Sequence, residues 1–164
     1  AGVAKGTFYI YFPSKDALIA EFISDYVDQV DADYRAVLQN LAPGTPVPQL
    51  LLGLIEKISD TLTGTIGCNS MRTVYKLLLE RNLGMDVVKG YGRDLYASFA
   101  DLLAEGISRG ELSSELSSDA LARHFVMAIR GLSYEWCIRY PDFDLKAEAL
   151  IHFKLLLSSI RNDR

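Results

Sequence analysis

Apolar positions recur along this chain with the period of an α-helix. From residue 15 to about 40, apolar side chains recur at every fourth position, which places them on one face of a single helix. These positions are Leu18, Phe22, Tyr26, Val30, Tyr34 and Leu38. Aspartates crowd the other faces, where we expect them to be exposed to solvent. They are Asp25, Asp28, Asp31 and Asp33.

The same period predicts further helices after residue 45, and no strand pattern of any length is visible. Their expected ranges are 45–64, 69–81, 86–110, 118–140 and 144–160. Pro46 suits a first helical turn, and Gly64 is expected to close that helix. Gly110 and Pro141 end two later helices, and Asp144 caps the last one. The sequence therefore predicts an all-α helical bundle.

The first fifteen residues, AGVAKGTFYIYFPSK, have a different character. Residues 4–12 form about two helical turns before Pro13 ends the helix. Phe8 lies on the side of this helix that can be buried, whereas Lys5 and Tyr9 lie on the opposite side. A helix that enters the major groove of DNA needs this division between a buried face and a face that meets phosphates and base edges.

The segment AGVAKGTFYIYFPSKDALIAE resembles the end of the helix-turn-helix of TetR-family transcriptional regulators. In that family A-G-V is the turn, the recognition helix follows, and F-P-S-K-D-A-L leads into a long helix that joins the DNA reader to the core. The resemblance implies a TetR-like bundle. Residues 1–17 would be the C-terminal part of the DNA-binding domain, with the recognition helix at about 4–12, and residues 18–164 the ligand-binding and dimerisation domain. Two helices that precede this stretch in the family are expected to be missing from the sequence as given.

Matching positions in the family motif indicate which residues contact DNA. Lys15, at the start of the next helix, can bind a phosphate together with that helix's free N–H groups. Tyr9 can donate its hydroxyl to a phosphate, and Ile10 can touch a thymine methyl. Tyr11 can alternatively pack in part against the preceding helices. The expected DNA contacts are Lys5, Gly6, Thr7, Tyr9, Ile10, Tyr11 and Lys15.

Charge and composition agree with this interpretation. The net charge is −4, but residues 1–15 hold two lysines and no acid, so a small basic end sits on an acidic body. No apolar run approaches the ~18–20 residues that a membrane span needs. Cys68 and Cys137 lack the spacing of metal ligands, and we expect buried free thiols in a cytoplasmic protein.

Aromatic and apolar side chains on the helices at 69–81, 86–110 and 118–140 could line a pocket. A mostly apolar cavity with few polar anchors is the usual small-molecule site, and the family resemblance implies an effector site among these helices. Alternatively, the same residues pack as an ordinary core. The candidates are Met71, Tyr75, Tyr96, Phe99, Phe125, Ile129 and Trp136.

The last two helices carry features of a subunit interface. Small residues on the helix at 118–140 let another helix approach closely, and the helix at 144–160 is apolar on more than one face, so it needs cover on two sides. A two-fold four-helix bundle with a second subunit agrees with how the family dimerises. The alternative is a monomer that buries its last helix centrally. The expected interface residues are Ala128, Gly131, Leu150, Phe153 and Leu157.

No catalytic, cofactor or metal motif is apparent. Glu148 and His152 lie four residues apart but lack further ligands, so we expect them to pair with each other. We interpret the protein as a non-enzymatic repressor that binds palindromic operator DNA as a homodimer. A small apolar or amphipathic effector would release it by changing the tilt of the helix at 15–40. The alternative is a small-molecule-binding helical scaffold protein without DNA-binding activity.

Overall fold

The structure is a computed structural model that describes residues 18, 27–36, 38, 42, 44–80 and 94–161. Within these residues the regular elements are helices, joined by one isolated antiparallel bridge between Leu112 and Arg161. Residues 27–36 are helical and precede the labelled elements. The labelled elements are α3 (Val47–Asp60), the π-helix η1 (Thr61–Ile66), α4 (Cys68–Leu79), α6 (Asp94–Ser108), α7 (Ser118–Arg139) and α8 (Leu145–Ile160). The predicted all-α fold is confirmed.

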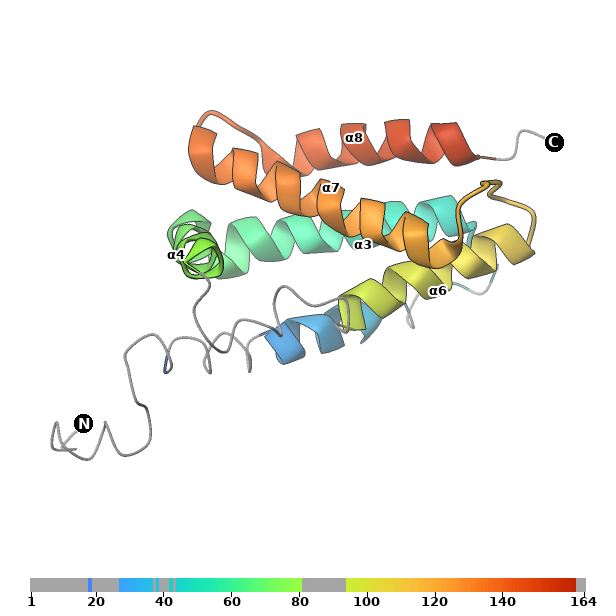
Figure 1. Cartoon of the computed structure of the whole chain (residues 1–164), viewed down its shortest axis with the longest axis horizontal. Helices are drawn as coiled ribbons and strands as arrows, with labels where there is room; N and C mark the ends of the chain where they lie inside the picture. The colour runs from blue at the N-terminus through green and yellow to red at the C-terminus, as the bar shows by residue number, and fades with distance from the viewer. Residues whose placement is uncertain are drawn as a thin grey trace, which may run out of the picture.

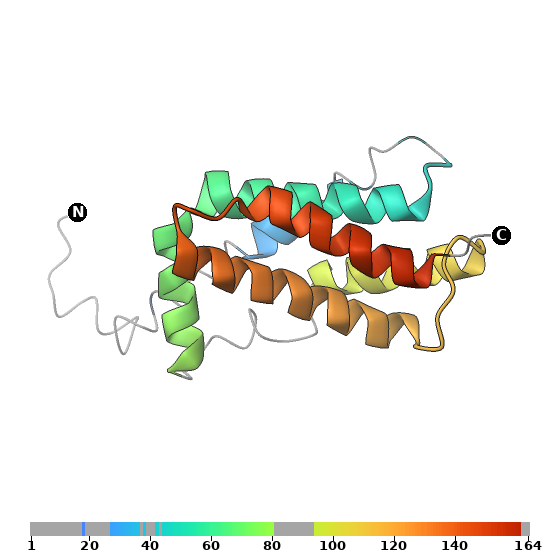
Figure 2. The same ribbon diagram turned by 90° about the horizontal axis from the view of Figure 1, so that it is seen from above.

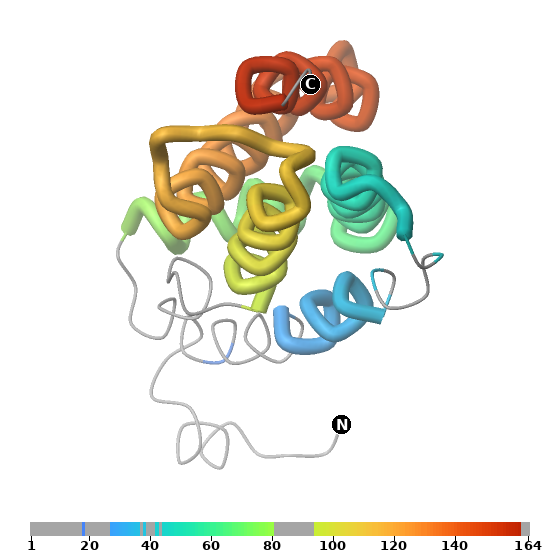
Figure 3. The backbone as a smooth tube through the Cα atoms, turned by 90° about the vertical axis from the view of Figure 1, so that its right-hand side faces the viewer, coloured from blue at the N-terminus to red at the C-terminus, as the bar shows by residue number. Residues whose placement is uncertain are grey.

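Four helices form a bundle with α4 across one end. α7 and α8 lie side by side as a hairpin, α3 packs against α8, and α6 packs against both α7 and α3 (Figure 1). α4 runs crosswise to the other helices and contacts α7, which is clearest from above (Figure 2). The helix at 27–36 lies on the opposite side of the bundle from α8, next to the start of α6 (Figure 3).

Side-chain caps begin α7 and α8. The Ser117 side chain accepts the Ala120 N–H at 3.2 Å, and Asp144 accepts the Ala147 N–H at 3.0 Å. The prediction that Gly64 closes the helix after residue 45 is wrong, because the chain continues through it as a π-helix. The turn comes at Gly67, whose φ of 80° is a conformation that glycine adopts without strain.

The helix at 27–36 buries one face as its apolar period predicts. Val30 and Tyr34 are 7% and 2% exposed, whereas Asp28 and Asp33 face solvent. The expectation of exposure is wrong for Asp31, which is only 3% exposed. Asp31 lies against the start of α6, where its Oδ2 accepts the N–H of Leu95 at 3.3 Å. This tertiary partner explains how an aspartate is accommodated on the buried side of the helix.

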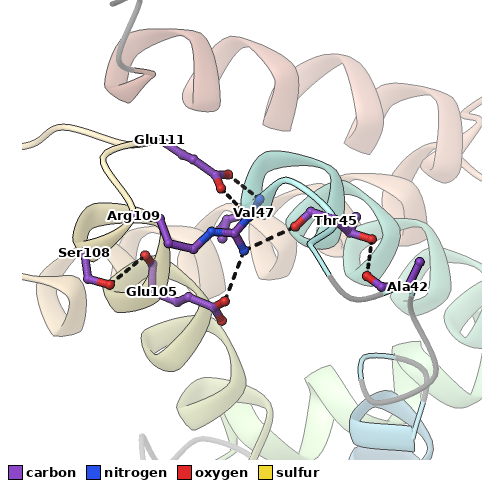
Figure 4. Close-up of polar contacts among 7 residues, drawn as sticks. All are labelled: Ala42, Thr45, Val47, Glu105, Ser108, Arg109 and Glu111. Carbon is purple, nitrogen blue, oxygen red and sulfur yellow. Dashed lines mark hydrogen bonds and ion pairs between the residues drawn. The ribbon is translucent and has the colours of Figure 1, made fainter.

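A polar cluster fastens the start of α3 to the end of α6 (Figure 4). Arg109 donates from Nη1 to Glu105 at 3.1 Å and to the Thr45 carbonyl at 3.3 Å. Its Nη2 lies 2.5 Å from Glu111 Oε1, and the other oxygen of that carboxylate accepts the Val47 N–H at 2.5 Å. The cluster therefore holds together the loop before α3, the end of α6 and the loop after it.

Candidate effector core and subunit interface

The seven candidate effector residues fall into two apolar clusters. Tyr96, Phe99, Phe125 and Ile129 belong to the main core between α3, α6, α7 and α8. Met71 and Trp136 belong to a smaller cluster where α4 crosses α7, and Tyr75 packs against it. The half-buried side chains of Leu62 and Leu132 pack against both clusters and so lie between them.

Aromatic rings run through the centre of the main core. The ring centroids of Phe99 and Phe125 are 5.8 Å apart, and those of Phe125 and Phe153 are 5.2 Å apart. These three rings come from α6, α7 and α8 in turn, and each is at most 2% exposed. Aromatic pairs at such separations stabilise a core beyond their buried area alone.

Tyr96 provides a polar group at the edge of the main core. Its ring is 8% exposed, and its hydroxyl donates to the Asp119 carbonyl at 2.9 Å. The same hydroxyl also contacts the Asp119 carboxylate. Because Asp119 lies in the first turn of α7, Tyr96 connects α6 directly to the start of α7.

The smaller cluster brings together both cysteines. Cys68 on α4 and Cys137 on α7 are 7% and 4% exposed and unpaired, so the expectation of buried free thiols is confirmed. Burial and the neighbouring Cys68 raise the pKa of the Cys137 thiol to about 11, although the nearby Arg72 guanidinium acts in the opposite direction. A thiol with this pKa is neutral and unreactive at neutral pH.

Two polar side chains tie α4 to α7 beside this cluster. Arg72 donates from Nε and Nη2 to the Cys137 carbonyl at 2.9 and 2.7 Å. The Tyr75 hydroxyl donates to the Arg130 carbonyl at 3.0 Å and also contacts the Ser133 hydroxyl. Burial raises the pKa of the Tyr75 phenol above its ordinary value. Tyr75 is therefore a neutral hydrogen-bonding group at neutral pH.

Together these residues form an apolar interior with few polar groups. Among the described residues, no three His, Cys, Asp or Glu side chains gather as a metal site. Sequence reasoning did not assign Phe153 and Asp119 to this core. The spacing Ala149–Phe153–Leu157 was a usable signal for the first, whereas the contact of Asp119 with Tyr96 depends on tertiary packing.

The structure corrects part of the interface prediction. Phe153 and Leu157 are 0% and 5% exposed within one protomer, so they leave little or no surface for a partner subunit. They share a face of α8 with the fully buried Ala149, and that face points into the protomer core. Ala128 and Leu150 are half-buried against the same core, and Gly131 is exposed.

Other apolar side chains occupy the exposed faces of α7 and α8. Tyr134 and Ile138 on α7 are 44% and 59% exposed, and Met127 on the same face is 47% exposed. On α8, Ile151 and Leu155 are 55% and 64% exposed. Spacings of four and seven residues place each set on one side of its helix, so the two neighbouring helices each present an apolar stripe to solvent.

Comparison with known proteins finds similarity to bacterial regulators, by a family model in the opening segment and by a relative over nearly the full chain. Residues 1–22 match the family model described as "Bacterial regulatory proteins, tetR family". The chain is 28% identical over 173 residues to the fatty acid metabolism regulator protein of Bacillus subtilis (strain 168), covering 99% of this chain and 81% of that protein.

The chain resembles regulators of the TetR family.

Solved structures share the fold of this chain. The transcriptional regulator FadR from Bacillus subtilis, in complex with stearoyl-CoA, has a TM-score of 0.73 at 23% identity, covering 98% of this chain and 84% of that one. FadR from Thermus thermophilus, a repressor in complex with lauroyl-CoA, has a TM-score of 0.68 at 20% identity, covering 95% and 77%.

The predicted DNA contacts of this chain lie outside the described residues. These are Lys5, Gly6, Thr7, Tyr9, Ile10, Tyr11 and Lys15, together with the proposed recognition helix at 4–12. They fall within the segment that matches the family model. In the part that the structure describes, none of the helices has the length and apolar character needed to span a bilayer.

Proposed function

We propose that this protein is a transcriptional repressor that binds operator DNA as a homodimer and is released by an amphipathic effector with a long apolar chain. One observation carries the proposal: a DNA-reading motif at residues 1–22 is followed by a core that aligns over nearly its full length with regulators of the same family. Neither a helical fold nor a short motif would carry it alone.

An acyl-CoA thioester is the effector class that the comparisons support. Two structural neighbours hold stearoyl-CoA and lauroyl-CoA, and a relative is a fatty acid metabolism regulator. The interior of this chain offers a matching chemistry, because the residues around Phe99 and Phe125 are apolar while Tyr75 and Tyr96 add hydrogen-bonding groups at the edges. An acyl chain would occupy the apolar interior and gain its affinity from burial.

The apolar stripes on α7 and α8 support a homodimer. Two copies meeting through these stripes would cover Ile138, Ile151 and Leu155 and bury Gly131 at a close helix–helix approach. A two-fold dimer holds two recognition helices, which reach successive major grooves when they sit ~34–36 Å apart. The matching operator is a palindrome.

Release follows from the energetics of two conformations. In one conformation of the dimer the two recognition helices are too far apart or too close to reach successive major grooves. An effector that binds this conformation more tightly shifts the population toward it. A tenfold loss of operator affinity requires a differential binding free energy of about 1.4 kcal/mol.

DNA binding by the full-length protein tests the reader assignment. The operator is selected from random duplexes, and its affinity is measured for Tyr9→Ala and Lys15→Ala, with Lys76→Ala on the exposed face of α4 as the control. We expect each reader variant to bind about tenfold more weakly, and Lys15→Ala to lower the salt slope of log K by about one. Reader variants that bind like the parent would contradict the assigned contacts.

The effector class is tested separately. We expect stearoyl-CoA and lauroyl-CoA to weaken operator binding by the parent protein, whereas coenzyme A without an acyl chain has no effect. An unchanged operator affinity with both acyl-CoA probes would contradict the proposed effector class and leave the DNA-binding assignment standing.

A further inference from the structure

The helix at 27–36 follows the DNA-reading segment in the chain and contacts the bundle at the first residues of α6 (Figure 3). Asp31 Oδ2 accepts the Leu95 N–H at 3.3 Å, and Arg35 Nη2 pairs with the Asp94 carboxylate. We call these four residues the α6 junction. The two contacts lie one helical turn apart on the same helix, so they fix its position and also its rotation.

Asp31 makes the α6 junction sensitive to displacement. Asp31 is 3% exposed, and its carboxylate accepts an N–H in the first turn of α6, where the helix dipole favours a negative charge. If the helix at 27–36 tilted away, this carboxylate would lose the Leu95 N–H, and removing a donor from a buried polar group is costly. The contact therefore favours this orientation of the helix at 27–36 over slightly tilted ones.

Arg35 and Asp94 contribute in another way. Their side chains are 52% and 50% exposed, so water screens the ion pair and its effect on the stability of the fold is small. The pair nevertheless crosses between the helix at 27–36 and α6. It can therefore be removed without unfolding the bundle, which makes it a usable experimental handle on the orientation of the helix.

α6 connects the α6 junction to the candidate effector residues within one turn. Tyr96 follows Leu95 directly and hydrogen-bonds to Asp119 on α7, and Phe99 packs its ring against Phe125 in the centre of the core. An α-helix transmits a displacement of these side chains to its own first turn because its backbone hydrogen bonds keep it rigid over that distance. A change in the core would consequently move the groups that Asp31 and Arg35 hold.

We propose that Asp31 and Arg35 are positioning residues for the operator response: through Asp94 and Leu95 they set the orientation of the helix that leads to the DNA reader. The inference rests on the proposed function, since the orientation matters only if residues 1–22 read DNA. It assigns the link between effector binding and operator binding to the start of α6, outside the effector core and outside the DNA contacts.

The first experiment measures coupling in the full-length protein. Operator affinity is determined with and without saturating stearoyl-CoA for Arg35→Gln, for the rescue variant Arg35→Lys, and for Asp31→Asn. The control is Lys76→Gln, which removes a surface cation from an ion pair confined to α4. The response ratio is the operator affinity without stearoyl-CoA divided by that with it. We expect this ratio to fall at least fivefold in Arg35→Gln and Asp31→Asn. It should stay within about twofold of the parent in Arg35→Lys and the control. Affinity for stearoyl-CoA itself should change by less than about twofold throughout.

An unchanged response ratio in both Arg35→Gln and Asp31→Asn would overturn the proposal. So would a loss of stearoyl-CoA affinity that accounts for the whole change in ratio, because that result would place these residues in the effector site instead.

The second experiment needs no effector. Spin labels at Asp28→Cys and Asp101→Cys, both on exposed positions, report the distance between the helix at 27–36 and α6. Labelled chains are diluted with unlabelled ones so that only distances within one protomer are seen, and the buried Cys68 and Cys137 stay unlabelled in the native state. We expect Arg35→Gln to broaden the distance distribution and Arg35→Lys to restore it, with the same melting temperature in all three proteins.

The two experiments separate the two proposals. A parent protein that binds its operator but ignores both acyl-CoA probes contradicts the proposed effector, and the spin-label result then decides the role of the α6 junction. If the spin-label distance distribution is as narrow in Arg35→Gln as in the parent, the proposed role of the α6 junction is overturned, whatever the acyl-CoA result.

Discussion

The Glu111 carboxylate accepts the backbone N–H of Val47 at 2.5 Å, from a position 64 residues later in the chain. Pro46 precedes α3 without a side-chain cap, and Pro48 has no N–H, so Val47 carries the first donor of the helix that needs a partner. Arg109 holds the other oxygen of the same carboxylate and also donates to the Thr45 carbonyl. The start of α3 is therefore capped by a side chain from the loop that follows α6.

Removing this distant cap should destabilise the fold. We expect Glu111→Ala to lower the free energy of unfolding by about 1–2 kcal/mol, because the Val47 N–H loses its acceptor and Arg109 loses one ion-pair partner. Urea denaturation followed by circular dichroism measures the change. Glu115→Ala, an exposed acid in the same loop, is the matched control and should stay within about 0.5 kcal/mol of the parent. Equal stability of both variants would contradict a capping role for Glu111.

Gly106 allows α6 to approach the start of α3. A Cβ at this position would lie 2.7 Å from Leu112 Cδ1 and 2.9 Å from Val47 Cγ1, and both neighbours are buried. We expect Gly106→Ala to cost about 1–3 kcal/mol through overpacking, despite the better helix propensity of alanine. Gly53→Ala, whose added Cβ would meet nothing within 4 Å, should be neutral or stabilising in the same denaturation experiment. If Gly106→Ala were as stable as Gly53→Ala, the close approach would be wrong.

Phe153 and Leu155 on α8 should respond to substitution in different ways. Phe153→Ala removes a fully buried ring and should lower the free energy of unfolding by about 3–5 kcal/mol. Leu155→Asp changes a side chain that is 64% exposed in the protomer and should convert the proposed dimer to a folded monomer. Sedimentation velocity and helicity distinguish the two effects. A Leu155→Asp protein that stays dimeric would argue against an interface through the outer face of α8.

The Cys137 thiol predicts a pH dependence of stability. Its pKa is about 11 in the folded protein and 9.0 in its unperturbed state, so the folded state disfavours the thiolate. The resulting stabilisation is fully present below pH 9 and is lost as the pH rises through about 11. We expect the free energy of unfolding to fall across this window more steeply in the parent than in Cys137→Ala. Parallel curves for the two proteins would show that Cys137 does not contribute.

Local sequence signals predicted most of the helices. Gly110, Pro141 and the Asp144 cap act within a few residues, so the ends of α6 and α7 and the start of α8 could be placed from the sequence. The apolar period likewise identified the buried face of the helix at 27–36 through Val30 and Tyr34. Gly64 misled the prediction because a π-helix accommodates it, and the signal for that irregular turn is weak in a single sequence.

Features that depend on distant partners could not be predicted. Asp31 is polar and lies among other aspartates, so its burial makes sense only with the start of α6 beside it. On α8 the apolar residues occupy several faces, and the period alone does not tell the face around Phe153 from that around Leu155. The polar ties of Arg72 and Tyr75 to carbonyl groups of α7 depend on the crossing of α4, which no local pattern encodes.

The chain ahead of α3 meets α6 twice, at its first residues through Asp31 and just past its last turn through Arg109. Each residue of an α-helix adds 1.5 Å of rise and roughly 100° of rotation, so an insertion or deletion of one residue in α6 would swing one attachment around the axis relative to the other. The length of α6 thus sets the relative position of the two attachments. Evolutionary changes in this length should come in whole turns or be matched by changes in the chain ahead of α3.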